Sequence, residues 1–64
     1  MNSKGMMINS IINHLQEHNT KKNQELMKDN LYWKQEAFDA GDMFFKLAFM
    51  PDDKVNHIAK LILG

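Results

Sequence analysis

The sequence predicts an all-α protein of three helices, and three observations lead to this fold class. Apolar residues recur at helical spacing near both ends of the chain, and a long central stretch carries two apolar stripes. No segment shows the alternating pattern of a strand. We expect a long central helix over residues 21–49, with two short helices folded back on its two halves.

The first short helix is expected over residues 6–18. Residues 1–5 are polar and are expected to be a disordered N-terminus. The helix is predicted by apolar residues at positions i, i+3, i+4 and i+7, which are Ile8, Ile11, Ile12 and Leu15.

A turn is expected between the first helix and the central one. Residues 16–25 contain no apolar residue, and Asn19 and Thr20 offer a turn and a helix N-cap. One unbroken helix over 6–49 is the alternative, because neither glycine nor proline intervenes. We favour the hairpin, since an unpaired long helix would leave its apolar faces in water.

The central helix is predicted to carry two apolar stripes. On a helical wheel with Glu25 at zero and about 100° per residue, the first stripe lies between roughly 60° and 140°. Its members are Leu26, Trp33, Ala37, Ala40, Phe44 and Ala48. The second stripe lies between roughly 200° and 240° and comprises Met27, Leu31, Phe38, Phe45 and Phe49. Packing on one core needs an arc of only about 100°. We therefore expect the second stripe to mediate self-association as a symmetric homodimer. A contact of this stripe with another protein stays open as the alternative.

Gly41 raises the question of whether the central helix is continuous. A glycine costs about 1 kcal/mol relative to alanine inside a helix, and Asp42 could cap a new helix. Both stripes nevertheless keep their phase across Gly41, and the small residues Ala37, Gly41 and Ala48 would let another helix approach closely. Continuity or a kink is favoured, and a break at Gly41 stays open.

The opposite side of the central helix is predicted to be an acidic ridge around one tyrosine. Its members lie within about 40° of zero on the same wheel and are Glu25, Asp29, Tyr32, Glu36 and Asp39. A solvated face is the ordinary interpretation. The functional interpretation is a partner-binding surface for a basic protein, in which tyrosine supplies amphipathic contact area.

The last helix follows Pro51, which ends the central helix and suits the first turn of the next. Asp52 and Asp53 would lie at the positive end of its dipole and Lys60 in its last turn. Gly64 closes the chain. The core stripe is expected to consist of Val55, Ile58, Ala59 and Ile62.

Length and composition point to one small domain over residues 1–64. The chain has no cysteine, so disulfides are excluded, and a scaffold of this size usually needs disulfides, a metal or oligomerisation. Self-association is the remaining source of stability. No signal peptide or membrane span is visible, which predicts a soluble, cytoplasmic protein.

His14-Leu15-Gln16-Glu17-His18 fits the H-x-x-E-H pattern of inverted zinc metalloproteases. Two histidines four residues apart on a helix can share a zinc ion. Catalysis also needs a third ligand and a substrate cleft, for which 64 residues leave little room. We therefore expect no enzyme activity and no cofactor. A metal-linked assembly through His14 and His18 is an alternative.

DNA binding through Lys21, Lys22 and Lys28 is a second alternative. Eight lysines balance eight acidic residues, so the net charge creates no electrostatic field that attracts nucleic acid. Arginine, the side chain best suited to phosphate and guanine recognition, is absent. No helix-turn-helix signature is present. Nucleic acid is therefore a disfavoured partner.

The favoured function is a non-enzymatic protein–protein interaction module. Two features motivate it, the excess apolar helix face and the acidic ridge. A short accessory regulator or inhibitor that binds a larger protein would fit the size of the chain. A phage or other mobile element would be a natural source of such a protein.

Overall fold

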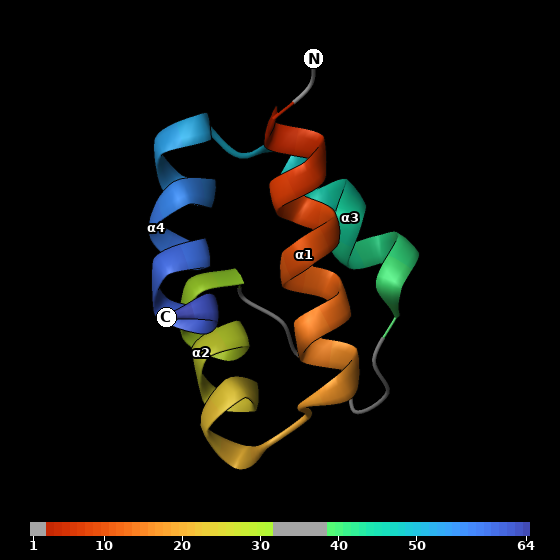
Figure 1. Ribbon diagram of the computed structural model, residues 1–64, viewed down its shortest axis with the longest axis vertical. Coiled ribbons are helices and arrows are strands. Elements are labelled where there is room, and N and C mark those ends of the chain that lie inside the picture. Colours follow the sequence, from red (N-terminus) through yellow and green to blue (C-terminus); the bar gives the residue numbers. More distant parts are fainter. Residues whose placement is uncertain (1–2, 32–38) are drawn as a thin grey trace.

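A computed structural model describes residues 3–31 and 39–64 of the chain. These residues form four α-helices and contain no strand, which confirms the all-α class (Figure 1). The helices are α1 (Ser3–Glu17), α2 (Lys21–Leu31), α3 (Ala40–Phe49) and α4 (Asp52–Leu63). Within the described residues, no helix is long and apolar enough to cross a membrane.

The helix at the centre of the packing is α1, and not the predicted stretch over 21–49. In Figure 1, α1 lies between α4 on one side and α3 on the other, and α2 packs against α4. The side chains that α1 buries are those of its predicted stripe, Ile8, Ile11, Ile12 and Leu15. The stripe was predicted correctly, but its role as the shared core of the other helices was not.

The predicted continuous helix over 21–49 is wrong. Helix α2 ends at Leu31, and α3 begins at Ala40 after Asp39, whose backbone is extended at φ −120° and ψ 103°. The Asp42 N–H donates to Oδ1 of Asp39 over 3.0 Å, so Asp39 is the N-cap of α3. Gly41 lies inside α3 and does not mark the break. An unbroken helix of this length would be roughly 45 Å long, whereas the longest extent of the molecule is 32 Å.

The break lets α3 turn a different side toward the core. Met43 and Leu47 are completely buried. On a continuous wheel they would fall at roughly 0° and 40°, on the side of the acidic ridge. Met27 in α2 is also buried, although it would fall at roughly 200° on that wheel. The buried side therefore shifts by about half a turn between the two helices.

The turn between α1 and α2 forms as predicted, which excludes the unbroken 6–49 alternative, but α2 packs against α4 rather than back onto α1. The Asn23 N–H donates to Oγ1 of Thr20 over 3.2 Å, so Thr20 caps α2. The buried Asn23 side chain donates from Nδ2 to the His18 carbonyl over 2.8 Å. This bond fixes the turn because it satisfies a buried amide and a carbonyl at the end of α1.

The N-terminus differs from the prediction. Helix α1 begins at Ser3, before the predicted start at residue 6, so residues 3–5 are helical rather than disordered. Residues 1–2 lie outside the described residues. The extra turn places Lys4 where α3 ends and α4 begins.

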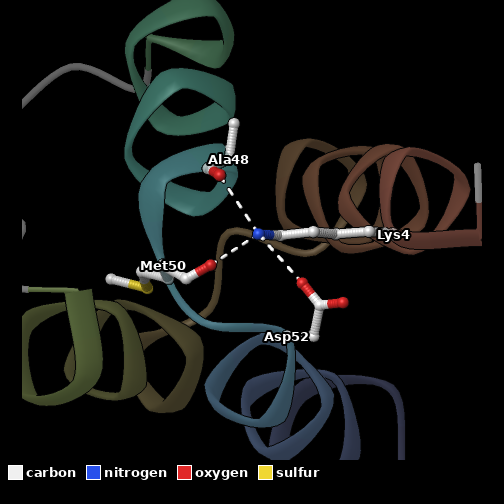
Figure 2. Close-up of polar contacts among 4 residues, drawn as sticks. All are labelled: Lys4, Ala48, Met50 and Asp52. Atoms are coloured by element: carbon white, nitrogen blue, oxygen red, sulfur yellow. Dashed lines mark hydrogen bonds and ion pairs between the residues drawn. The ribbon is translucent and has the colours of Figure 1, made fainter.

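Lys4 joins three helices through a single ammonium group (Figure 2). Its Nζ donates to the carbonyls of Ala48 at 3.1 Å and Met50 at 2.5 Å, and it lies 3.1 Å from Oδ1 of Asp52. A cation is favourable here because the last carbonyls of a helix have no partner within it and carry partial negative charge. The contact therefore fastens the corner between α3 and α4 to the start of α1.

Helix α4 follows the sequence prediction closely. Asp52 and Asp53 lie in its first turn and Lys60 in its last. Gly64 has a positive φ of 90° and donates its N–H to the Lys60 carbonyl over 3.2 Å, so it closes the helix. The buried residues are those predicted, Val55, Ile58, Ala59 and Ile62.

Candidate protein-interaction surface

The outward side of α3 presents three phenylalanines to solvent. Phe45 is 64% exposed, Phe49 77% and Phe44 37%. The rings of Phe45 and Phe49 lie 4.8 Å apart between centroids with a tilt of 53°, a geometry typical of paired aromatic rings. We refer to Phe44, Phe45 and Phe49 as the α3 aromatic face.

The order of residues in α3 explains why these rings point outward. Met43 and Leu47 are four residues apart and share the side that packs into the core. At about 100° per residue, Phe45 lies about 180° from the midpoint of that side, with Phe49 beside it and Phe44 near its margin. Burying Met43 and Leu47 therefore forces Phe45 and Phe49 into solvent.

The core of the described residues is complete without the α3 aromatic face. It consists of Ile8, Ile11, Ile12, Leu15, Met27, Met43, Leu47, Val55, Ile58, Ala59 and Ile62. No buried side-chain nitrogen or oxygen in the described residues lacks a hydrogen-bond partner. Taking a phenylalanine side chain as about 200 Å², the three rings expose about 350 Å². This area is comparable to the largest apolar patch on a typical monomer, and such patches are often functional.

The predicted self-association stripe is brought to the surface only in part. Phe45 and Phe49 are exposed, as that prediction requires. Met27 is only 3% exposed and belongs to the core, so its assignment to a self-association surface is wrong. The reason is the half-turn shift between α2 and α3. Phe38 and the side chain of Leu31 lie outside the described residues.

The predicted acidic ridge is not one continuous helix face. Glu25 and Asp29 are exposed on α2, which ends at Leu31. Asp39 belongs to α3, where its carboxylate caps the helix. Tyr32 and Glu36 lie outside the described residues, so their part of the prediction concerns a segment of which the structure gives no account.

The lysines proposed for DNA binding share their surface with acidic residues. Lys21, Lys22 and Lys28 are exposed on α2. On a wheel of α2, Glu25 and Asp29 fall between Lys21 and Lys22 within an arc of about 100°. Charges of both signs are therefore interleaved on this face. Such a face supplies little of the concentrated positive potential that phosphate binding uses.

The two histidines of the H-x-x-E-H pattern do come together. The rings of His14 and His18 lie 4.7 Å apart between centroids and are tilted by 40°. Among residues 3–31 and 39–64, no group of three histidine, cysteine or acidic side chains is placed to hold a metal ion. The pair could supply two ligands at most, and a zinc site usually needs at least three from protein.

The sequence contained a signal for the α3 surface that the prediction did not use. Met43 and Leu47 fall on the polar side of a continuous central helix, where large apolar residues are out of place. Their four-residue spacing indicates a separate buried stripe for α3. If that stripe is taken as the core side of α3, Phe44 falls at an exposed margin rather than in the first apolar stripe of the central helix.

Comparisons with known proteins do not assign this chain to a family. No protein-family model matches it, and neither a curated protein nor a solved structure matches it. The geometry of the α3 aromatic face is therefore the main guide to function.

Proposed function

We propose that this protein is a non-enzymatic interaction module that binds protein through the α3 aromatic face. The observation that carries the proposal is the exposure of Phe45 and Phe49, at 64% and 77%, next to a core that is complete without them. Aromatic residues are enriched in the centres of protein interfaces because they bury a large area with few rotatable bonds.

The contiguity of the surface distinguishes it from ordinary exposed apolar residues. Single exposed apolar side chains are common on soluble proteins and carry no functional meaning. Met6, for example, is 62% exposed on α1 and faces away from the core stripe. Phe45 and Phe49 differ from Met6 because their rings are in contact and form one patch.

The proposed mode of action is occupation of a surface on a larger partner, as a small accessory regulator or inhibitor. A short helix with aromatic anchors at i and i+4 suits a hydrophobic groove on another protein. A cytoplasmic site of action and an origin in a phage or other mobile element belong to the same proposal.

Site-specific photo-crosslinking tests this proposal. The probe is p-benzoyl-phenylalanine in place of Phe45, and the matched control is the same probe in place of Met6, whose exposure is nearly equal. Both proteins are produced in the cells that encode the chain, irradiated, and the adducts identified by mass spectrometry. We expect a defined protein adduct from position 45 that position 6 does not give. The proposal fails if position 45 gives no adduct or the same adducts as position 6.

A further inference from the structure

The end of α1 brings two histidine side chains together on the surface. His14 and His18 are four residues apart, and the His18 N–H donates to the His14 carbonyl over 2.8 Å, so the helical turn between them is closed. Residues at this spacing share one side of a helix. The ring centroids accordingly lie 4.7 Å apart with a tilt of 40°. His18 is exposed and His14 is half-buried, so both side chains reach solvent.

The distance between the rings matches that of two imidazoles bound to one metal ion. A metal–nitrogen bond of about 2.0–2.1 Å places each ring centroid about 3.2 Å from the ion. Two such rings have centroids about 4.5 Å apart when the bonds meet at about 90°, and about 5.2 Å apart at the tetrahedral angle. The 4.7 Å between His14 and His18 lies between these two values. Rotation of the two side chains, with the backbone in place, is therefore enough to bind an ion between them.

Core packing and the following turn hold the backbone of both histidines. Leu15, which lies between them in the sequence, is completely buried and anchors this part of α1 on the core. The Asn23 side chain donates from Nδ2 to the His18 carbonyl over 2.8 Å and ties the end of α1 to α2. Metal binding therefore orders little beyond the two rings, and a pre-organised site loses less affinity to ordering.

We propose that His14 and His18 form a chelating pair that binds a divalent transition-metal ion. Imidazole nitrogen is a good ligand for Ni²⁺, Cu²⁺ and Zn²⁺, whereas Mg²⁺ and Ca²⁺ prefer oxygen. Within residues 3–31 and 39–64, no third histidine, cysteine or acidic side chain is placed to complete the ligand set. The remaining coordination positions are therefore open to water or to a group of another molecule. This inference does not depend on the proposed function, because it uses no residue of the α3 aromatic face.

Isothermal titration calorimetry of the full chain with NiCl₂ tests the pair. His14→Ala and His18→Ala should each bind Ni²⁺ at least about tenfold more weakly than the wild type, because a single imidazole loses the advantage of an intramolecular second bond. His57→Ala is the matched control, since His57 is exposed on α4 and belongs to no metal-binding group of the described residues. Its dissociation constant should equal that of the wild type. MgCl₂ should give no binding to the pair.

A re-spaced variant separates a chelate from the mere presence of histidines. His18→Ala combined with Gln16→His keeps three histidines in the chain but places the two on α1 about 160° apart around the helix. Gln16 is exposed, so the change leaves the core intact. We expect this variant to bind Ni²⁺ as weakly as His18→Ala alone. Circular dichroism checks the fold of each variant. Where a variant does not fold, NMR of the wild type asks whether paramagnetic Ni²⁺ broadens the His14 and His18 ring signals together and before those of His57.

Each outcome decides whether the pair is a metal site. Wild-type binding no tighter than that of the re-spaced variant overturns the inference, as does an equal loss in His57→Ala. Binding that survives both single changes on α1 overturns it too, because the ion is then held elsewhere. A loss confined to the His14 and His18 variants supports the inference, whether one ion binds per chain or two pairs share one ion. The position-45 photo-crosslink is measured without added metal, so failure of either proposal leaves the other standing.

Discussion

Helices α2 and α3 are of similar length and both contribute to the core, yet their outer surfaces are opposites. Helix α2 buries Met27 and exposes interleaved lysines and carboxylates. Helix α3 buries Met43 and Leu47 and exposes phenylalanines. The buried side chains of both helices belong to one core, so the difference between the helices lies in their outer sides. Charged residues on the outer side of α2 are explained by contact with water alone. Exposed phenylalanines on the outer side of α3 are not, and they need another explanation.

The largest expected effect contrasts the two sides of α3 itself. Leu47→Ala leaves a cavity in the core and should lower the free energy of unfolding by about 2–5 kcal/mol. Phe45→Ala should change it by less than about 0.5 kcal/mol, because the ring is mostly exposed. Urea unfolding followed by circular dichroism at low micromolar concentration measures both. A Phe45→Ala loss as large as that of Leu47→Ala would show that the outer side of α3 is also needed for folding.

The next effect concerns the attachment of α3 to α1. Lys4→Met keeps the aliphatic stem but removes the ammonium group from the Ala48 and Met50 carbonyls and from Asp52. We expect a loss of about 1–2 kcal/mol in the free energy of unfolding. Lys28→Met on the exposed face of α2 is the control and should be close to neutral. Equal urea midpoints for the two variants would show that the Lys4 junction contributes nothing.

The helix caps offer a smaller and matched pair of changes. Thr20→Ala in α2 and Asp39→Ala in α3 should each cost about 1 kcal/mol of stability. Asp39→Asn should be nearly neutral, because asparagine caps helices as well as aspartate does. Thermal unfolding resolves the three variants. If Asp39→Asn were as damaging as Asp39→Ala, the charge of Asp39 rather than its capping bond would stabilise the start of α3.

The smallest expected effect is a gain. A Cβ added at Gly41 would meet only Oδ1 of Asp39, at an ordinary contact distance of 3.5 Å. Gly41→Ala should therefore stabilise the monomer by about 0.5 kcal/mol, since alanine favours the helix. Thermal unfolding measures the change, and a Gly41→Ala variant less stable than the wild type would contradict the expected gain.

The parts of the fold that the sequence predicted correctly are those set by local pattern. Helices α1 and α4 each carry one apolar stripe at regular helical spacing, and Thr20, Pro51 and Gly64 mark boundaries by their own chemistry. Such signals need no knowledge of the rest of the chain.

The errors arise where packing between distant segments decides the outcome. Two apolar stripes that keep phase are equally consistent with one helix or with two helices rotated against each other. The matching phase of the stripes on either side of Gly41 therefore does not test whether the helix is continuous. Tertiary packing routinely overrides helix propensity, and here α3 packs on α1 whereas α2 packs on α4. The Lys4 junction joins Lys4 to Ala48 and Met50, which lie 44 and 46 positions further along the chain, and no local pattern reveals such a contact.

The candidate surface was predicted only in part, because the prediction assumed a continuous central helix. Phe45 and Phe49 were assigned to an exposed stripe, and they are exposed. Met27 was placed with them only because a continuous helix was assumed. The dimer itself stays a prediction.

The central position of α1 has a consequence for folding during synthesis. Of the four described helices, α1 is made before α3 and α4, which pack on it, and α4 is the last of the four. At about 5–20 residues per second, the α1 stripe stays uncovered for several seconds. A nascent chain that stalls before α4 would leave the apolar stripe of α1 partly uncovered, which makes such intermediates candidates for chaperone binding or aggregation.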